Sequence, residues 1–285
     1  SGFIQAAAII IIISQFTTAF GVEFPVEGLK KIPYLLTHLH ELKLNTTLLF
    51  LISIIFLFFF AIFFPRFPTS IFLVLVTGFL SYLFDFEKYG LLLIGEVPRG
   101  LPEFIFPTVN INTIKYLPGA LGIAIIASIG SSIMAIKLEP YQPKKIKLDR
   151  EYMSLGLAKI ISSFFGSMLS AGSFNRTILA YKIGGKTQIT GIVSSIIILF
   201  TILYLTPVVY YFPQSVIAAL IIYSVYFLFD FNLISKLWRE DKIELSYIFV
   251  TMAITLFIGL VEGILLGVII KYLGDYIYKK IINLS

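Results

Sequence analysis

The sequence predicts an all-α protein that crosses a membrane many times, and three observations support this fold class. Hydrophobic residues make up 58% of the 285 residues, charged residues only 13%, and the mean hydropathy is +0.94. Soluble domains carry about 25% charged residues, so this composition is typical of a chain surrounded by lipid. Apolar runs of about 20 residues, the length that crosses a bilayer core, follow one another along the chain. The basic residues lie mainly between these runs.

The apolar runs set the predicted elements in order. We expect membrane helices over 2–20, 46–64, 69–84, 117–136, 152–170, 187–212, 213–229, 245–261 and 263–278. The connections that we expect are polar or proline-rich segments over 21–45, 85–116 and 137–151, an amphipathic charged helix over 230–244, and a tight turn at Glu262-Gly263. Each apolar run ends where charged residues, proline or glycine gather, as expected where a helix leaves the lipid.

Two of the predicted spans, 117–136 and 152–170, are rich in glycine, alanine and serine. Small residues let helices pack closely, and they also leave room beside a cavity. From the residues alone both interpretations stay open.

The placement of the basic residues explains the net charge of +6 and orients the chain. If the first span runs outward, most of the 22 basic residues fall in the inner connections. The positive-inside rule then predicts a cytoplasmic C-terminus. Because topology accounts for the charge, we expect no nucleic-acid partner.

The residues that could support catalysis or metal binding are few. The chain has no cysteine, which excludes disulfides and thiolate metal sites. Its two histidines, His38 and His40, alternate in a polar connection with no third ligand evident nearby. No paired intramembrane aspartates and no credible Ser–His pair are evident, so we predict no enzyme activity, no metal and no cofactor.

One segment places a charged residue at the depth of the membrane, next to small residues. Arg176 follows Ser-Ala-Gly-Ser-Phe-Asn within an apolar region and stands at the predicted start of a short helix. An arginine at membrane depth costs several kcal/mol unless it meets water, a partner or a ligand. A helix N-terminus adds free N–H groups and about half a positive charge, so the segment is suited to a small anion. The alternatives are an interfacial arginine or the structural partner of a carboxylate.

The segment Gly184-Gly185-Lys186-Thr187 superficially resembles a phosphate-binding loop. It lacks the first glycine at the required spacing, and no strand precedes it. The sequence therefore favours a helix end at the two glycines over a nucleotide site.

These segments together resemble a known family. Gly172-Ser173-Phe174-Asn175-Arg176-Thr177 followed by Gly184-Gly185-Lys186-Thr187-Gln188 resembles the signature of the SulP anion transporters, the sulfate permease family. Other pieces agree in order, namely Gly2-Phe3-Ile4, Val97-Pro98-Arg99-Gly100-Leu101-Pro102, Thr206-Pro207, Pro213-Gln214-Ser215-Val216 and Val261-Glu262-Gly263-Ile264.

The resemblance implies part of a fold of fourteen transmembrane segments, built as two inverted seven-helix repeats of the uracil-permease-like type. It implies gate-domain helices over 1–86 (family segments five to seven), an extracytoplasmic loop or interfacial segment over 87–116, core-domain helices over 117–212 (segments eight to eleven) with a short half-helix and an extended segment at the substrate site, and further gate-domain helices over 213–285 (segments twelve to fourteen). On this alignment the first four segments and the STAS domain that usually follows would lie outside the chain. Because Ser1 leads directly into an apolar run, we also expect an incomplete chain.

The resemblance also implies the site residues. Arg176 would supply positive potential at the anion, and Ser173 and Asn175 would lie beside the N-terminus of the short helix. The family often has serine where this chain has Asn175, which leaves the anion preference open. Ser131 stands where many members carry a glutamate linked to cation or proton coupling, so exchange or uncoupled movement is favoured here. The neighbouring Ser132 and Gly130 are further candidates for the cavity wall.

The predicted function is secondary transport of small inorganic anions across the cell membrane by an elevator-type movement. Sulfate is the first candidate substrate, and bicarbonate or chloride follow. One alternative is a non-transporting fragment, or one half of a split transporter whose partner is an N-terminal half. Another is a nucleobase permease of the same fold, although Ser131 and Arg176 replace the acidic pair that such permeases favour. A homodimer is the remaining partner to consider, besides the lipid bilayer.

Overall fold

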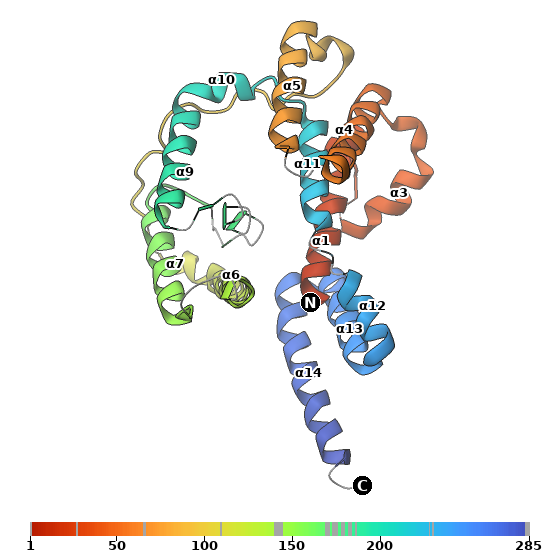
Figure 1. The fold of residues 1–285 in the computed structure, drawn as a ribbon, viewed down its shortest axis with the longest axis vertical. Helices are drawn as coiled ribbons and strands as arrows, with labels where there is room; N and C mark the ends of the chain where they lie inside the picture. Colours follow the sequence, from red (N-terminus) through yellow and green to blue (C-terminus); the bar gives the residue numbers. More distant parts are fainter. Residues whose placement is uncertain are drawn as a thin grey trace. The chain divides into compact units, whose positions relative to one another are not determined.

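The computed structural model of the chain describes residues 2–26, 28–64, 67–108, 110–139, 145–168, 172, 176–177, 180–181, 184–185, 187–227, 229 and 231–282. In this part of the chain the backbone is helical apart from connections and one isolated antiparallel bridge, between Leu93 and Pro213. The chain divides into two compact units (Figure 1). Unit 1 is Ser1–Pro98 with Thr206–Ser285, and unit 2 is Arg99–Leu205.

Unit 1 holds most of the helices. Its α-helices are α1 (Gly2–Ser14), α2 (Phe16–Phe20), α3 (Lys31–Thr37), α4 (Leu44–Phe63), α5 (Thr69–Phe84), α10 (Thr206–Val209), α11 (Gln214–Tyr226), α12 (Phe231–Glu240), α13 (Lys242–Phe257) and α14 (Leu260–Ile282). Short 3-10 helices are η1 (Gly28–Lys30), η2 (Leu39–Glu41) and η3 (Phe86–Tyr89).

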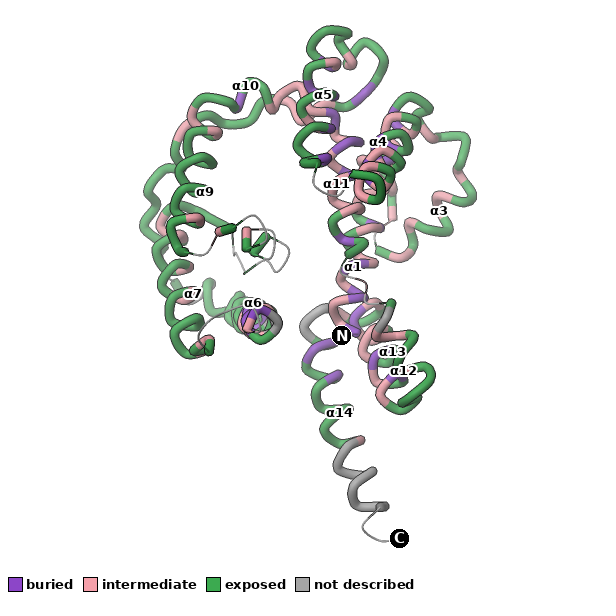
Figure 2. Tube along the Cα trace, in the orientation of Figure 1, coloured by how far each residue is buried: buried purple, intermediate pink, exposed green. Residues whose placement is uncertain are grey.

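The core of unit 1 lies around α11, which packs against α1, α2, α4 and α5. Its buried residues come from helices far apart in the sequence and are Ala19, Phe50, Leu57, Leu73, Val216, Ala218 and Ala219. Buried positions recur along α1 and α11 (Figure 2). The alanines of α11 let the bulky side chains of α4 approach its backbone, as in other membrane helix pairs.

Glycines fix the packing of α14 on α13. A methyl group at Gly263 would lie 2.0 Å from Oγ1 of Thr255, and one at Gly267 would lie 2.7 Å from the side chain of Thr251. The spacing of four residues places both glycines on one face of α14, and both threonines on one face of α13. The two helices therefore touch where α14 has no side chain.

An extended segment closes one end of unit 1 over the start of α11. The backbone N–H of Ile94 donates to the carbonyl of Phe212 at 3.0 Å, and that of Gln214 donates to the carbonyl of Leu92 at 2.9 Å. The side chain of Gln214 also donates to the carbonyl of Leu93 at 2.9 Å. These bonds satisfy backbone groups that a helix start and an irregular segment would otherwise leave unpaired.

Among the residues that the structure describes, unit 2 contains fewer helices than unit 1, and they are more exposed. They are η4 (Ile111–Tyr116), α6 (Leu117–Leu138), α7 (Leu148–Ser163), α9 (Ile189–Phe200) and the π-helical turn η6 (Thr201–Leu205). Among the residues described, α7 and α9 contain none that is buried, and α9 is exposed along most of its length in Figure 2. The π turn precedes Pro207, whose missing N–H and bulky ring disturb the helical hydrogen bonds of the preceding turn.

The helices confirm most of the predicted spans. Four are long and apolar enough to cross a membrane, namely Gly2–Phe20, Leu44–Phe63, Thr113–Ile136 and Ile189–Val209. Shorter apolar helices cover Thr69–Phe84 and Gln214–Tyr226.

Three expectations about boundaries are wrong. The amphipathic helix predicted over 230–244 ends at Glu240 as α12, because the Asp241 carboxylate caps α13, which begins at Lys242. The helix predicted over 152–170 is α7, which begins at Leu148 and ends at Ser163, because its polar first turn is helical and a turn through Gly166 follows it. The turn between the closing helices lies at Ile258 and Gly259, not at Glu262-Gly263. Gly263 is needed for helix packing, and it lies within α14.

Candidate functional site

The candidate site lies within unit 2, between α6 and the segment that carries Arg176. The backbone of Arg176 and Thr177 is helical, as the sequence predicts. The expected anion-binding residues Ser173 and Asn175 lie outside the described residues.

Contacts of Gly172 and Thr177 bring the segment against α6. At Gly172 a methyl group would lie 2.6 Å from Cε of Met134 and 3.8 Å from Oγ of Ser131. The hydroxyl of Thr177 lies 3.7 Å from Sδ of Met134. Ser131 and Met134 are three residues apart, so they share one face of α6. This face is the one that meets the Arg176 segment.

Ser131 is buried and has its hydroxyl proton engaged. It is 2% exposed, and its Oγ donates to the carbonyl of Ala127 at 2.8 Å. Such a bond to the preceding turn leaves the oxygen lone pairs but no free proton. In this conformation Ser131 presents an acceptor toward the segment. To donate to an anion, the hydroxyl would have to rotate away from Ala127.

The other two candidates for the cavity wall point elsewhere. The Ser132 hydroxyl donates to the carbonyl of Ser128 at 2.8 Å and makes a short hydrogen bond with the phenol of Tyr152. Because its one proton is used by Ser128, Tyr152 is the donor in that pair. Ser132 therefore ties α6 to α7. At Gly130 a methyl group would meet open space.

Arg176 is exposed, and within the described part of the chain no carboxylate lies within ion-pair distance of it. A guanidinium carries five N–H donors in a planar fork that suits two oxygen atoms of one anion. The surroundings described here are a small-residue helix and a glycine approach, not a structural ion pair.

The two glycines after this segment confirm the predicted helix end. Gly184 has a φ of +96°, its N–H donates to the carbonyl of Tyr181 at 3.0 Å, and the N–H of Gly185 donates to that of Ala180 at 2.8 Å. This pair of bonds is the Schellman pattern of a helix C-terminus, for which glycine in the left-handed region is favoured. Such a pattern uses the backbone N–H groups that a phosphate loop would present.

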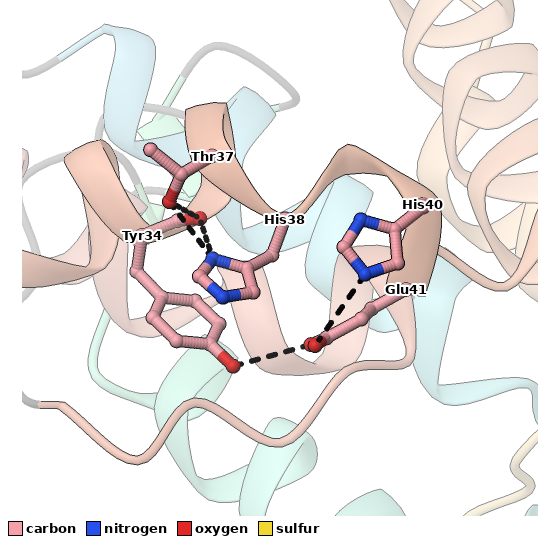
Figure 3. Close-up of polar contacts among 5 residues, drawn as sticks. All are labelled: Tyr34, Thr37, His38, His40 and Glu41. Atoms are coloured by element: carbon pink, nitrogen blue, oxygen red, sulfur yellow. Dashed lines mark hydrogen bonds and ion pairs between the residues drawn. The ribbon is translucent and has the colours of Figure 1, made fainter.

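The two histidines take part in local hydrogen bonding and stacking. Figure 3 shows the Tyr34 phenol donating to Oε2 of Glu41 at 3.2 Å, and Nδ1 of His38 3.1 Å from the Tyr34 carbonyl. The His38 ring stacks on that of Tyr34 with centroids 4.1 Å apart, and Nε2 of His40 lies 4.0 Å from Oε1 of Glu41. Desolvation, together with the hydrogen bond to Glu41, raises the pKa of Tyr34. In the described residues no group of three or more His, Asp or Glu side chains could hold a metal.

The structure adds two residues to the site that the sequence did not single out. Met134 lies close to both Gly172 and Thr177 of the segment, and Tyr152 forms a hydrogen bond with Ser132. Met134 could have been found from its spacing of three residues from Ser131. No sequence signal pairs Tyr152 with α6, because that contact joins two helices across a polar connection.

Comparison with known proteins adds independent information. Residues 1–255 match the profile of the sulfate permease family. The chloroplastic sulfate transporter 4.1 of Arabidopsis thaliana is 36% identical over 186 residues, which cover 64% of this chain and 27% of that protein.

Two solved structures share the fold. The murine Solute Carrier 26 family member A9 anion transporter in the inward-facing state matches with a TM-score of 0.87 and 23% identity, over 97% of this chain and 47% of that one. The transmembrane domain of the cyanobacterial bicarbonate transporter BicA matches with a TM-score of 0.75 and 19% identity, over 92% of this chain and 67% of that one. The chain thus spans about half or less of the longer relatives. Its helices are part of the inverted-repeat transporter fold, and the chain belongs to the sulfate permease family, a family of multi-pass membrane transporters and not of enzymes.

Proposed function

We propose that this chain carries out secondary transport of small inorganic anions, with sulfate the first candidate and bicarbonate or chloride next. Family membership supports the class of substrate. The names of the relatives support the order, since one is a sulfate transporter and another a bicarbonate transporter.

The observation that carries the proposal is the combination of Arg176 and the Ser131 face of α6. The guanidinium has no carboxylate partner in the described residues, and Gly172 and Thr177 hold its segment against a helix of small residues. An anion would receive N–H donors from Arg176 and from the start of the short helix, with Ser173 and Asn175 beside it. Ser132 and Gly130 would form more distant parts of the wall.

The transport movement that we propose is of the elevator type. In this proposal residues 117–212 form the moving core, residues 1–86 and 213–285 belong to the fixed gate, and 87–116 connect them outside the cytoplasm. The packing supports such a division, because the buried cluster of unit 1 joins α2, α4, α5 and α11 without a residue from unit 2. The distribution of basic residues supports a cytoplasmic C-terminus.

The test is binding and uptake of radiolabelled sulfate by the purified chain in proteoliposomes. Arg176→Ala should weaken binding about tenfold or more, because charged hydrogen bonds to the anion are lost. Arg176→Lys should retain part of the binding, since it keeps the charge and loses the fork. Arg150→Ala is the matched control, because it removes an exposed arginine from the first turn of α7.

Three outcomes separate the alternatives. Unchanged sulfate binding by Arg176→Ala would contradict the site. Uptake that appears only with a second polypeptide carrying an N-terminal half, or only in a homodimer, would assign transport to that assembly. Competition by uracil and not by sulfate would favour a nucleobase permease.

A further inference from the structure

Helix α12 (Phe231–Glu240) presents two different faces. Its half-buried apolar side chains, Leu233, Ile234 and Leu237, lie on the side that packs against α13. The opposite side carries Lys236 and Arg239, both exposed. Such a pattern is typical of a helix that lies on a surface.

The apolar side of α12 extends beyond the part that α13 covers. Phe231 is 55% exposed and Trp238 is 64% exposed. They are seven residues apart, which is close to two helical turns, so they lie on the same side of α12. Two exposed aromatic rings are unusual on a helix that is surrounded only by water. Aromatic rings are enriched at membrane–water interfaces.

Further aromatic rings lie close to Phe231. The Phe231 ring is 5.7 Å from that of Phe229 and 5.9 Å from that of Tyr226, at the end of α11. The Tyr226 ring in turn lies 5.2 Å from that of Phe58 in α4. The group therefore joins the C-terminal part of α4 and the end of α11 to the start of α12, as an aromatic belt does.

The acidic residues Glu240, Asp241 and Glu244, near the end of α12, form ion pairs or hydrogen bonds within the protein. Glu240 lies 3.7 Å from the ammonium of Lys236. Asp241 caps α13 by accepting the N–H groups of Ile243 and Glu244 at 3.0 and 2.9 Å. Glu244 pairs with Lys271 at 2.7 Å.

Two cations remain at this end of α12, namely Arg239 on α12 and Lys242 at the start of α13. In the described part of the chain neither has a carboxylate within ion-pair distance. The local acidic groups do not neutralise these cations, so they can attract an anionic surface.

We propose that this face of α12, together with Lys242 at the start of α13, binds anionic phospholipids at the membrane interface. Phe231 and Trp238 lie at the boundary of headgroups and acyl chains, and Arg239 and Lys242 bind lipid phosphates. The connections favour a lipid surface over a protein partner, since Asp241 alone separates α12 from α13. A helix tied this closely to membrane helices emerges at the bilayer surface, where an amphipathic basic helix is held by apolar burial and charge.

Trp238 is the only tryptophan of the chain, so its fluorescence reports on α12 alone. The chain is reconstituted in vesicles of phosphatidylcholine, with and without phosphatidylserine. The emission is quenched in turn by brominated phosphatidylcholine and by acrylamide in the water. We expect strong quenching by lipids brominated near the headgroup and weak quenching by acrylamide. Phosphatidylserine should strengthen this difference, and added salt should reduce its effect.

The double variant Arg239→Gln/Lys242→Gln should lose the response to phosphatidylserine and keep the quenching seen in phosphatidylcholine. The matched control Lys147→Gln/Arg150→Gln removes the same two kinds of charge at the start of α7 and should retain the response. Circular dichroism establishes that each variant keeps its helical content. Free access of acrylamide to Trp238 in both kinds of vesicle would overturn the proposal. So would shielding from acrylamide without quenching by brominated lipid, which would indicate a protein contact. The readout does not depend on sulfate transport.

Discussion

Units 1 and 2 both contain strongly apolar spans, but these spans differ in how much of them is buried. In the span Gly2–Phe20 of unit 1, 28% of the most apolar window is buried, and in Leu44–Phe63 it is 22%. In unit 2 the span Thr113–Ile136 is buried to a similar extent, 25%, but in Ile189–Val209, most of which is the α9 region, only 6% is buried. The most hydrophobic helices of the two units therefore have different surroundings.

The difference shows that hydropathy and packing are encoded separately. Long apolar runs require an apolar environment, which lipid supplies as well as protein does, so they predict spans without predicting contacts. Contacts come from shape: the alanines of α11, and the glycines of α14 that meet the threonines of α13. In unit 2 the small residues of α6 are partly buried, as at Ala127, Ser131 and Ala135, whereas α9 has bulky, exposed isoleucines on all sides.

Cavity formation should separate the units most strongly. Leu57→Ala removes a side chain that is 0% exposed, and we expect a loss of about 2–5 kcal/mol of stability. Ile196→Ala removes a side chain that is 59% exposed on α9, and the loss should be below about 0.5 kcal/mol. Thermal unfolding of both variants in the same detergent measures the difference. Equal losses would mean that α9 is packed as tightly as α4.

The sequence was sufficient for the positions of the spans because the bilayer imposes a length and a composition. Four predicted spans recur as helices of 19 to 24 residues. Boundaries failed where local chemistry competes with hydropathy. The polar first turn of α7 carries Asp149 and Glu151, which favour a helix N-terminus, although hydropathy assigns these residues to a loop.

Added methyl groups compare the close contact between α13 and α14 in unit 1 with the open surface of α9 in unit 2. Gly263→Ala places a methyl group 2.0 Å from Oγ1 and 2.8 Å from Cα of Thr255, and we expect a loss of about 1–3 kcal/mol. Gly191→Ala makes the same change on α9, where nothing lies within 4 Å. It should gain about 0.5–1 kcal/mol, because alanine favours a helix over glycine. Melting temperatures in detergent check both, and a stable Gly263→Ala protein would contradict the close approach of α13 and α14.

The candidate site was less predictable than the fold. Arg176 was conspicuous because charge at membrane depth is costly, and Ser131 came only from the family resemblance. Tyr152 was missed because a tyrosine in an apolar chain carries no signal of its own, and Met134 was missed although its spacing of three residues places it on the Ser131 face of α6. Their importance depends on which helices meet, and composition does not specify this.

Gly172→Ala tests whether the close approach of the Arg176 segment to α6 supports the candidate site. Gly172→Ala would bring Cβ to 2.6 Å from Cε of Met134, a flexible end that can move, so stability should fall by less than about 1 kcal/mol. The segment would shift from α6, and if the proposed site is correct, sulfate binding should weaken several-fold. Met134→Ala makes room for the methyl group, so the double variant should regain binding. Sulfate binding and melting temperature are measured together; a parallel fall in both, without rescue, would indicate a purely structural role.

The smallest expected effect concerns the surface of unit 1, where a polar connection is held by side chains and not by apolar burial. The raised pKa of Tyr34 means that the folded state holds the phenol proton more tightly than the unfolded state, whose pKa is about 10. The stabilisation is complete below the unfolded pKa and is lost as the pH rises through the folded pKa. Tyr34→Phe should therefore melt earlier than the wild type at neutral pH, and the two proteins should converge in the alkaline range. Because the other tyrosines are common to both proteins, the difference between the melting temperatures isolates Tyr34. A constant difference across the alkaline range would show that the folded state holds the Tyr34 proton no more tightly than the unfolded state, and would contradict the role given to burial and to the hydrogen bond with Glu41.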